Sequence, residues 1–196
     1  MSIHAFTSIT LNYLPKARVL ARSLKRIHPE IIFHLLLAEA TADDYLSDRD
    51  PFDEITLVTE LGIEDLERWI FAHNVVEICT AVKGLYLNKI LIRDNCEAVL
   101  YFDPDIVLLA RLDALIARFD QGAILLTPHQ LKPEEHLDAI LDNEVCSLRH
   151  GVFNLGFLGV KRSAEGIEFA RWWQRRGSRA DRECIANSGR TAAARN

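Results

Sequence analysis

Apolar residues fall in short runs along the chain, separated by segments in which apolar positions recur every three or four residues. The short runs predict strands at His4–Thr10, Ile31–Ala38, Ile55–Val58, Val99–Phe102, Ala123–Thr127 and Val152–Val160. The helical spacing predicts helices that open at Asn12–Pro15, run through Val75–Lys89, span Leu112–Phe119 and Glu134–Leu141, and follow Ser163 through Phe169 and Trp172. Strands that alternate with helices indicate an α/β domain with a mostly parallel sheet flanked by helices.

Composition places the chain among ordinary globular proteins, with 49% hydrophobic and 26% charged residues in a length of 196. The opening MSIHAFTSIT lacks both a basic region and a long apolar core, so we expect no signal peptide. The four cysteines form no CxxC pair, which favours free thiols in a reducing compartment over a zinc site. The expected location is therefore the cytoplasm.

Charge is distributed unevenly. The net charge of −5 argues against a nucleic-acid-binding protein. Residues 171–196 nevertheless carry seven arginines against Asp181 and Glu183, with few large apolar side chains. Ordering backbone costs about 1–2 kcal/mol per residue, and this composition offers little burial to offset that cost. We therefore expect one domain over residues 1–175 and a basic, disordered tail over 176–196, which could contact the inner face of a membrane.

Two carboxylates follow the buried strand that ends at Phe102. In the sequence Asp103-Pro104-Asp105, the proline fixes φ and stiffens the turn, so that both carboxylates can point toward one place. Hard divalent cations and diphosphates favour such an oxygen-rich geometry. The alternative is an Asx turn, in which Asp103 only caps the backbone that follows it.

Three further stretches accompany this turn. In chain order the set is Asn12-Tyr13, Thr80-Ala81-Val82-Lys83, Tyr101-Phe102-Asp103-Pro104-Asp105 and Gly151-Val152-Phe153-Asn154-Leu155-Gly156. In this order they resemble the GT-A glycosyltransferases, particularly the group of glycogenin and the bacterial lipopolysaccharide galactosyltransferases. The resemblance covers residues 4 to about 175 and implies the GT-A form of a Rossmann-like sheet.

The resemblance also implies a role for each matching residue. Tyr13 would lie against the nucleobase, Asp103 would contact ribose and metal, and Lys83 would reach the donor sugar or Asp103. The implied sets are Thr7, Ser8, Asn12, Tyr13 and Asp103 for the nucleotide, Lys83, Asn154 and Gly156 for the sugar, and Asp103 and Asp105 for Mn²⁺ or Mg²⁺. The implied partners are a nucleoside diphosphate sugar, with a UDP-sugar expected, and a hydroxyl acceptor such as lipopolysaccharide or another glycan.

Two of these residues also stand out on physical grounds. Lys83 lies on a mainly apolar helix face, where an ammonium group needs either a partner, such as the carboxylate turn, or an extended path to solvent. Asn154 lies between apolar neighbours in a strand, so its amide is either a ligand contact or a hydrogen-bonded core group.

The expected function is metal-dependent transfer of a sugar from a nucleoside diphosphate to a hydroxyl group, that is, a hexosyltransferase-like glycosyltransferase. The alternative is a non-catalytic nucleotide-sugar-binding module with an incomplete acceptor site, because the sequence after Trp173 has no Asp-Gln pair and no histidine, both common there in similar proteins. A nucleotidyltransferase is disfavoured because Thr7–Leu14 contains no glycine, and a dehydrogenase because no G-x-G-x-x-G follows any strand.

Overall fold

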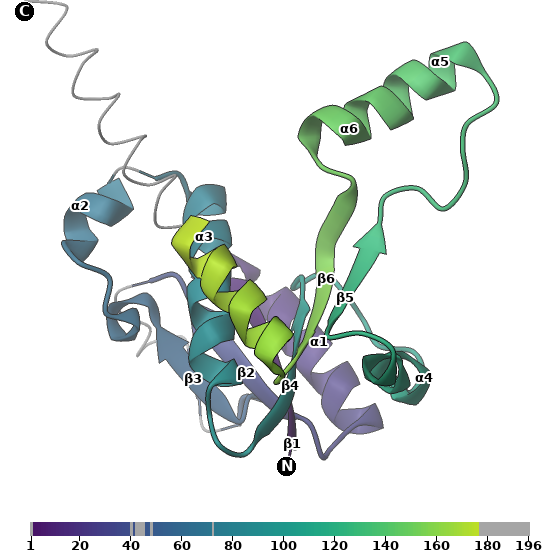
Figure 1. Ribbon diagram of the computed structural model, residues 1–196. Coiled ribbons are helices and arrows are strands. Elements are labelled where there is room, and N and C mark those ends of the chain that lie inside the picture. The colour runs from purple at the N-terminus through teal and green to yellow at the C-terminus, as the bar shows by residue number, and fades with distance from the viewer. Residues whose placement is uncertain (1, 40, 42–45, 48, 72, 177–196) are drawn as a thin grey trace, which may run out of the picture.

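The computed structural model describes residues 2–39, 41, 46–47, 49–71 and 73–176, and within them six strands form one sheet (Figure 1). The strands are β1 (Ser2–Ile9), β2 (Ile32–Leu37), β3 (Glu54–Leu57), β4 (Cys96–Phe102), β5 (Ile124–Pro128) and β6 (Phe153–Lys161), in the order β3-β2-β1-β4-β6-β5. The first four are parallel, whereas β6 pairs antiparallel with both β4 and β5. The expected α/β class and mostly parallel sheet are therefore confirmed.

The helices cover the sheet and connect its strands. They comprise α1 (Leu14–Ile27), α2 (Leu66–Phe71), α3 (Val75–Leu91), α4 (Asp113–Ile116), α5 (Leu137–Ala139), α6 (Cys146–His150) and a last helix over residues 164–176. Turns of 3₁₀ helix precede α1 (Leu11–Tyr13), follow β3 (Val58–Leu61) and follow α4 (Ala117–Asp120), and a π-helix, Ile140–Val145, joins α5 to α6. Short α2 has no counterpart among the sequence predictions.

One predicted helix has different bounds. The segment expected at Glu134–Leu141 begins instead at Leu137 and continues through the π-helix to His150. Its start is later because the backbone of His136 is extended, with φ −109° and ψ 139°, so that helical geometry begins only at the next residue. Its end falls at Gly151, whose φ of 127° is one that residues with a Cβ rarely adopt.

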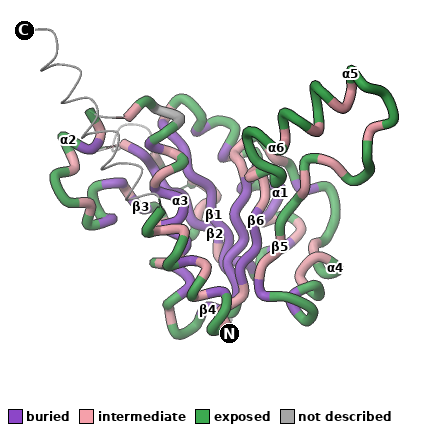
Figure 2. Tube along the Cα trace, turned by 45° about the horizontal axis from the view of Figure 1, so that its top comes forward, coloured by how far each residue is buried: buried purple, intermediate pink, exposed green. Residues whose placement is uncertain are grey.

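The two faces of the sheet bury separate hydrophobic clusters. Along β4, Val99 and Tyr101 pack into the cluster that contains α3, whereas Ala98, Leu100 and Phe102 pack into the cluster that contains α1. This alternation follows from the two-residue period of a strand. Figure 2 shows the resulting concentration of buried residues in the central strands. From Ala98 onward, side chains at the odd positions of β4 therefore face α3.

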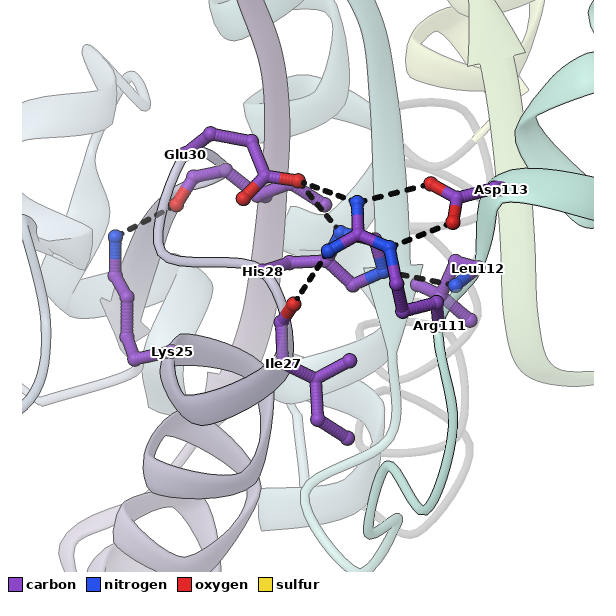
Figure 3. A network of polar contacts seen from close by, with 8 residues as sticks. Lys25, Ile27, His28, Glu30, Arg111, Leu112 and Asp113 are labelled. Atoms are coloured by element: carbon purple, nitrogen blue, oxygen red, sulfur yellow. Dashed lines mark hydrogen bonds and ion pairs between the residues drawn. The ribbon is translucent and has the colours of Figure 1, made fainter.

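A polar network ties the end of α1 to the segment after β4 (Figure 3). His28, which caps α1, accepts the Leu112 N–H at Nε2 over 2.8 Å, so Nδ1 carries the proton and donates to Glu30 at 2.7 Å. Arg111 donates to Glu30 at 3.3 Å and to Asp113 at 2.6 Å. The network fixes the path of the chain that leaves the Asp103 turn.

The last helix packs on the same face as α3. Ser163 accepts the Gly166 N–H at 3.1 Å, which confirms the predicted N-cap. A Cβ added at Gly84 of α3 would lie 3.2 Å from Trp173, so the two helices approach closely at this glycine. Phe169 and Trp173 pack against the α3 cluster, whereas Trp172, for which the same helical spacing indicates a core position, is 46% exposed.

Between β5 and β6 the chain leaves the body of the domain as a helical arm, residues 129–152 (Figure 1). Leucines on this arm are largely exposed, Leu131 at 87% and Leu148 at 75%. None of the helices in the described part of the chain is both long and apolar enough to cross a bilayer. The basic tail expected over 176–196 lies, from residue 177 onward, outside the described residues.

Candidate functional site

Most of the residues that the sequence singles out lie along one edge of the sheet, namely the edge formed by the carboxyl ends of its parallel strands. The parallel strands β1, β2 and β4 all end at this edge, and β6 begins there because it runs antiparallel to β4. The Asp103 N–H donates to the Gly156 carbonyl at 2.9 Å, which joins the end of β4 to the start of β6. In open α/β sheets, ligands bind beyond the carboxyl ends of the strands, so this edge is the candidate site.

The Asp103-Pro104-Asp105 segment forms a turn closed by a hydrogen bond from the Ile106 N–H to the Asp103 carbonyl, at 3.2 Å. The Asp103 side chain is 38% exposed, and Asp105 is exposed. The Asp103 carboxylate bonds to two side chains, Lys83 and Tyr101. It therefore does not act as the backbone cap that the Asx-turn alternative requires.

Lys83 is paired with this carboxylate. The residue is only 7% exposed, and its Nζ donates to Asp103 Oδ1 at 3.3 Å. The ammonium also lies 4.4 Å from the centre of the Tyr101 ring, a distance suited to a cation–π contact. The lysine thus takes the carboxylate as its partner and does not extend to solvent.

Tyr101 contacts both Lys83 and Asp103, although the sequence analysis assigns it no function. Its hydroxyl donates to Asp103 Oδ1. Burial, and then the negative charge of Asp103, raise the pKa of the Tyr101 hydroxyl, so it stays protonated and remains a donor. The sequence does contain a signal for this contact: Tyr101 precedes Asp103 by two residues, which places both side chains on the same face of the strand.

Asn154 and Gly156 lie beside the carboxylate on β6. The Asn154 Oδ1 accepts the Gly156 N–H at 2.6 Å, and Asn154 is exposed, so it is not a core amide. A Cβ at Gly156 would lie 2.7 Å from Asn154 Oδ1 and 3.8 Å from Asp103 Oδ2. Glycine here leaves room for the asparagine and keeps the space beside Oδ2 open.

Asn12 and Tyr13 lie in the 3₁₀ turn that follows β1 at the same edge. Thr10 donates its hydroxyl to Asn12 Oδ1, and the Tyr13 N–H donates to the Thr10 carbonyl at 2.9 Å. Tyr13 is 41% exposed and has the Lys16 Nζ 4.7 Å from its ring centre. Its ring is therefore exposed enough to stack on a base.

Thr7 and Ser8 project from opposite faces of β1. Ser8 is buried on the α3 side and donates to the Cys79 carbonyl at 3.1 Å. Thr7 is fully buried, and its hydroxyl has no hydrogen-bond partner among the residues that the structure describes. Their side chains are thus enclosed, so these two positions can contact a nucleotide only through backbone atoms.

Glu39, after β2, was not expected at the site from the sequence. Its carboxylate accepts the Leu11 N–H at 3.3 Å and so supports the 3₁₀ turn that contains Asn12 and Tyr13.

The two carboxylates are oxygen ligands of the kind that a metal site uses. Within the described ranges, no group of three or more His, Cys, Asp or Glu side chains is arranged to hold a cation. Mg²⁺ and similar ions, however, are commonly held by one or two carboxylates together with substrate phosphates and water. The Asp103 side chain, which is 38% exposed, and the exposed Asp105 fit that kind of site.

No protein-family model matches the sequence, and a search of curated proteins finds no match. Solved structures do match the fold. The glycosyltransferase GlyE of Streptococcus pneumoniae superposes on 87% of this chain with a TM-score of 0.51 and 16% identity. The mannosyltransferase Ktr4p of S. cerevisiae covers 90% at a TM-score of 0.51 and 9% identity. Core-mannan synthase A of Aspergillus fumigatus, in an Mn/GDP form, covers 94% at 0.52 and 7% identity. The chain has the GT-A fold.

The GT-A expectation from the four sequence stretches is thus confirmed for the fold. The chain spans 36%, 61% and 65% of the lengths of these three GT-A structures. At identities of 7–16%, the likeness carries over the architecture and leaves activity to be argued from the site itself.

Proposed function

We propose that this GT-A chain binds a nucleoside diphosphate sugar at the edge formed by β1, β4 and β6 and acts in the transfer of the sugar to a hydroxyl acceptor. The observation that carries the proposal is the cluster at the end of β4. There Asp103, which follows β4, is bonded to two other elements. Its carboxylate accepts a hydrogen bond from Lys83 of α3, and its N–H donates to the Gly156 carbonyl of β6. The Lys83 ammonium and the partly exposed Asp103 carboxylate form a polar surface suited to a sugar and its diphosphate.

The donor would extend along this edge. Tyr13 offers an exposed ring for the base, and Asp103 Oδ2 is placed to accept a hydrogen bond from a ribose hydroxyl. Asn154, exposed at the start of β6, would contact the donor sugar. A UDP-sugar is the donor that we favour, and a glycan such as lipopolysaccharide is the acceptor class.

Asp103 and Asp105 would hold a divalent cation, Mn²⁺ or Mg²⁺, together with the diphosphate oxygens. Such a cation neutralises the charge of the departing diphosphate as a Lewis acid. The Lys83 ammonium would offset the repulsion between these carboxylates and the phosphate groups, because it lies 3.3 Å from Asp103 Oδ1.

Release of nucleoside diphosphate tests this function. The full chain would be incubated with UDP-glucose, UDP-galactose and GDP-mannose, each with manganese, and both release and binding would be measured. We expect slow release from one donor even without acceptor, since water can replace the hydroxyl group. Lys83→Met should reduce that release at least tenfold, and Lys89→Met, which changes an exposed lysine near the end of the same helix, should leave it unchanged.

The outcomes also separate the alternative function. Binding of a donor with no release, and no transfer to any glycan offered, would favour a non-catalytic nucleotide-sugar-binding module. This alternative stays open because structures at 7–16% identity carry over the fold and not the activity. A chain that binds none of the three donors would contradict both functions.

A further inference from the structure

Tyr101 is fully buried on β4, yet its hydroxyl ends at the Asp103 carboxylate. Both side chains project toward the α3 face, because they are two residues apart on one strand. The Tyr101 ring packs against Phe6, with the ring centres 5.0 Å apart. Because the ring is held from behind, its hydroxyl is fixed at one place beside the carboxylate.

Both donors that reach the Asp103 carboxylate use the same oxygen. Oδ1 accepts the Tyr101 hydroxyl and also the Lys83 ammonium, at 3.3 Å. Among the described residues, Oδ2 accepts no hydrogen bond, and the Asp103 side chain is 38% exposed. The two oxygens of this carboxylate therefore have different surroundings, one filled by the protein and one open.

We propose that Tyr101 is a positioning residue for the donor: its hydroxyl, with Lys83, occupies Oδ1 and so presents Oδ2 to the divalent cation that binds with a nucleoside diphosphate. This inference rests on the proposed function of the site. Without the hydroxyl, the carboxylate can rotate about its Cβ–Cγ bond, and Lys83 can attract either oxygen. Binding must then order the carboxylate, which costs affinity.

Tyr86 provides a matched control. It is also fully buried, and its ring contacts the same Phe6, with the centres 5.4 Å apart. Its hydroxyl bonds to Thr56 at 2.8 Å and has no contact with Asp103. Tyr101→Phe and Tyr86→Phe thus each remove one buried hydroxyl from one aromatic cluster, but only the first alters the carboxylate.

The test measures the affinity of the full chain for UDP and for GDP by calorimetry, in manganese and in EDTA. Wild type should bind one of the two nucleotides more tightly in manganese. Tyr101→Phe should lower that affinity about tenfold, equivalent to ~1.4 kcal/mol, and should change the affinity in EDTA by less than about twofold. Tyr86→Phe should leave both affinities unchanged.

Each other outcome has one meaning. Unchanged affinity in Tyr101→Phe would overturn the inference and leave the proposed function standing. Equal losses in manganese and in EDTA, or the same losses in Tyr86→Phe, would overturn it too, since the hydroxyl would then be purely structural. If Tyr101→Phe does not fold, Lys83→Met tests the same oxygen, and unchanged manganese-dependent affinity there would overturn the inference. Wild type that binds neither nucleotide would contradict the proposed function itself.

Discussion

At the scale of single residues, Asp103 shows how a short motif acquires its geometry from elements far away in the sequence. Its N–H is bonded to β6, and its Oδ1 is bonded to Lys83 on α3. Asp105 has a different environment, since it is exposed at the tip of the same turn. The hydrogen-bonded Asp103 carboxylate is suited to orient the donor, and the exposed Asp105 carboxylate is suited to coordinate a cation.

Tyr13→Ala tests the other end of the donor site. The Tyr13 ring is 41% exposed, and stacking of a base on an aromatic ring contributes about 1–3 kcal/mol. We expect the variant to bind a nucleoside diphosphate and its sugar conjugate about tenfold more weakly, by the same factor for both, because the base is common to the two. Titration calorimetry with UDP and UDP-glucose checks this. A loss confined to the sugar conjugate would place Tyr13 at the sugar instead.

At the scale of elements, the strands β1, β2 and β3 share a buried polar chain. His4 Nδ1 and His34 Nε2 lie 2.8 Å apart, and His34 Nδ1 lies 3.3 Å from the Glu54 carboxylate, which Arg93 binds at 2.8 Å. Both histidines are fully buried. Burial lowers the pKa of His34 to about 4, and the nearby Glu54 charge offsets only part of that effect.

This histidine makes stability depend on pH. In the unfolded chain a histidine titrates near pH 6.5, so between about pH 6.5 and 4 the unfolded state binds a proton that folded His34 does not. The free energy of unfolding should therefore fall as the pH falls, by about 3 kcal/mol from this residue at pH 4. Urea unfolding of wild type and His34→Gln from pH 7 to 4 measures it. The variant should show a shallower fall, and equal slopes would assign the dependence to other groups.

The sequence predicts these elements unevenly, for physical reasons. The central strands β1, β2 and β4 follow from apolar runs, because a strand covered on both faces needs apolar side chains at nearly every position, whereas the edge strands β3 and β5 are less buried. The apolar spacing alone places the arm helix too early and makes it too short, because it cannot indicate that His136 is extended or that a π-helix continues the helix to His150. The sequence gives Tyr101 the pattern of a core residue, because its ring is buried. Only its hydroxyl reaches the site, where it bonds to Asp103.

At the scale of the whole molecule, the fold separates stability from function. The α1 and α3 faces of the sheet hold the core, whereas the edge where β1 and β4 end holds the polar cluster. Substitutions at that edge should therefore alter binding with little effect on folding. The GT-A architecture could be predicted because the four stretches that carry the resemblance all map to this sheet, to α3 or to the turns between them.

Manganese-dependent thermal stabilisation by a donor tests the central claim most directly. At a hundredfold excess over its dissociation constant, a ligand stabilises the folded state by about 2.7 kcal/mol, or roughly 5–10 °C in a domain of this size. We predict such a shift for wild type with a UDP-sugar and manganese, and for Asp120→Asn, which changes an exposed carboxylate after α4. Asp105→Asn should lose the manganese-dependent part of the shift and keep the unliganded melting temperature. Equal manganese-dependent stabilisation of Asp105→Asn and wild type would contradict the account.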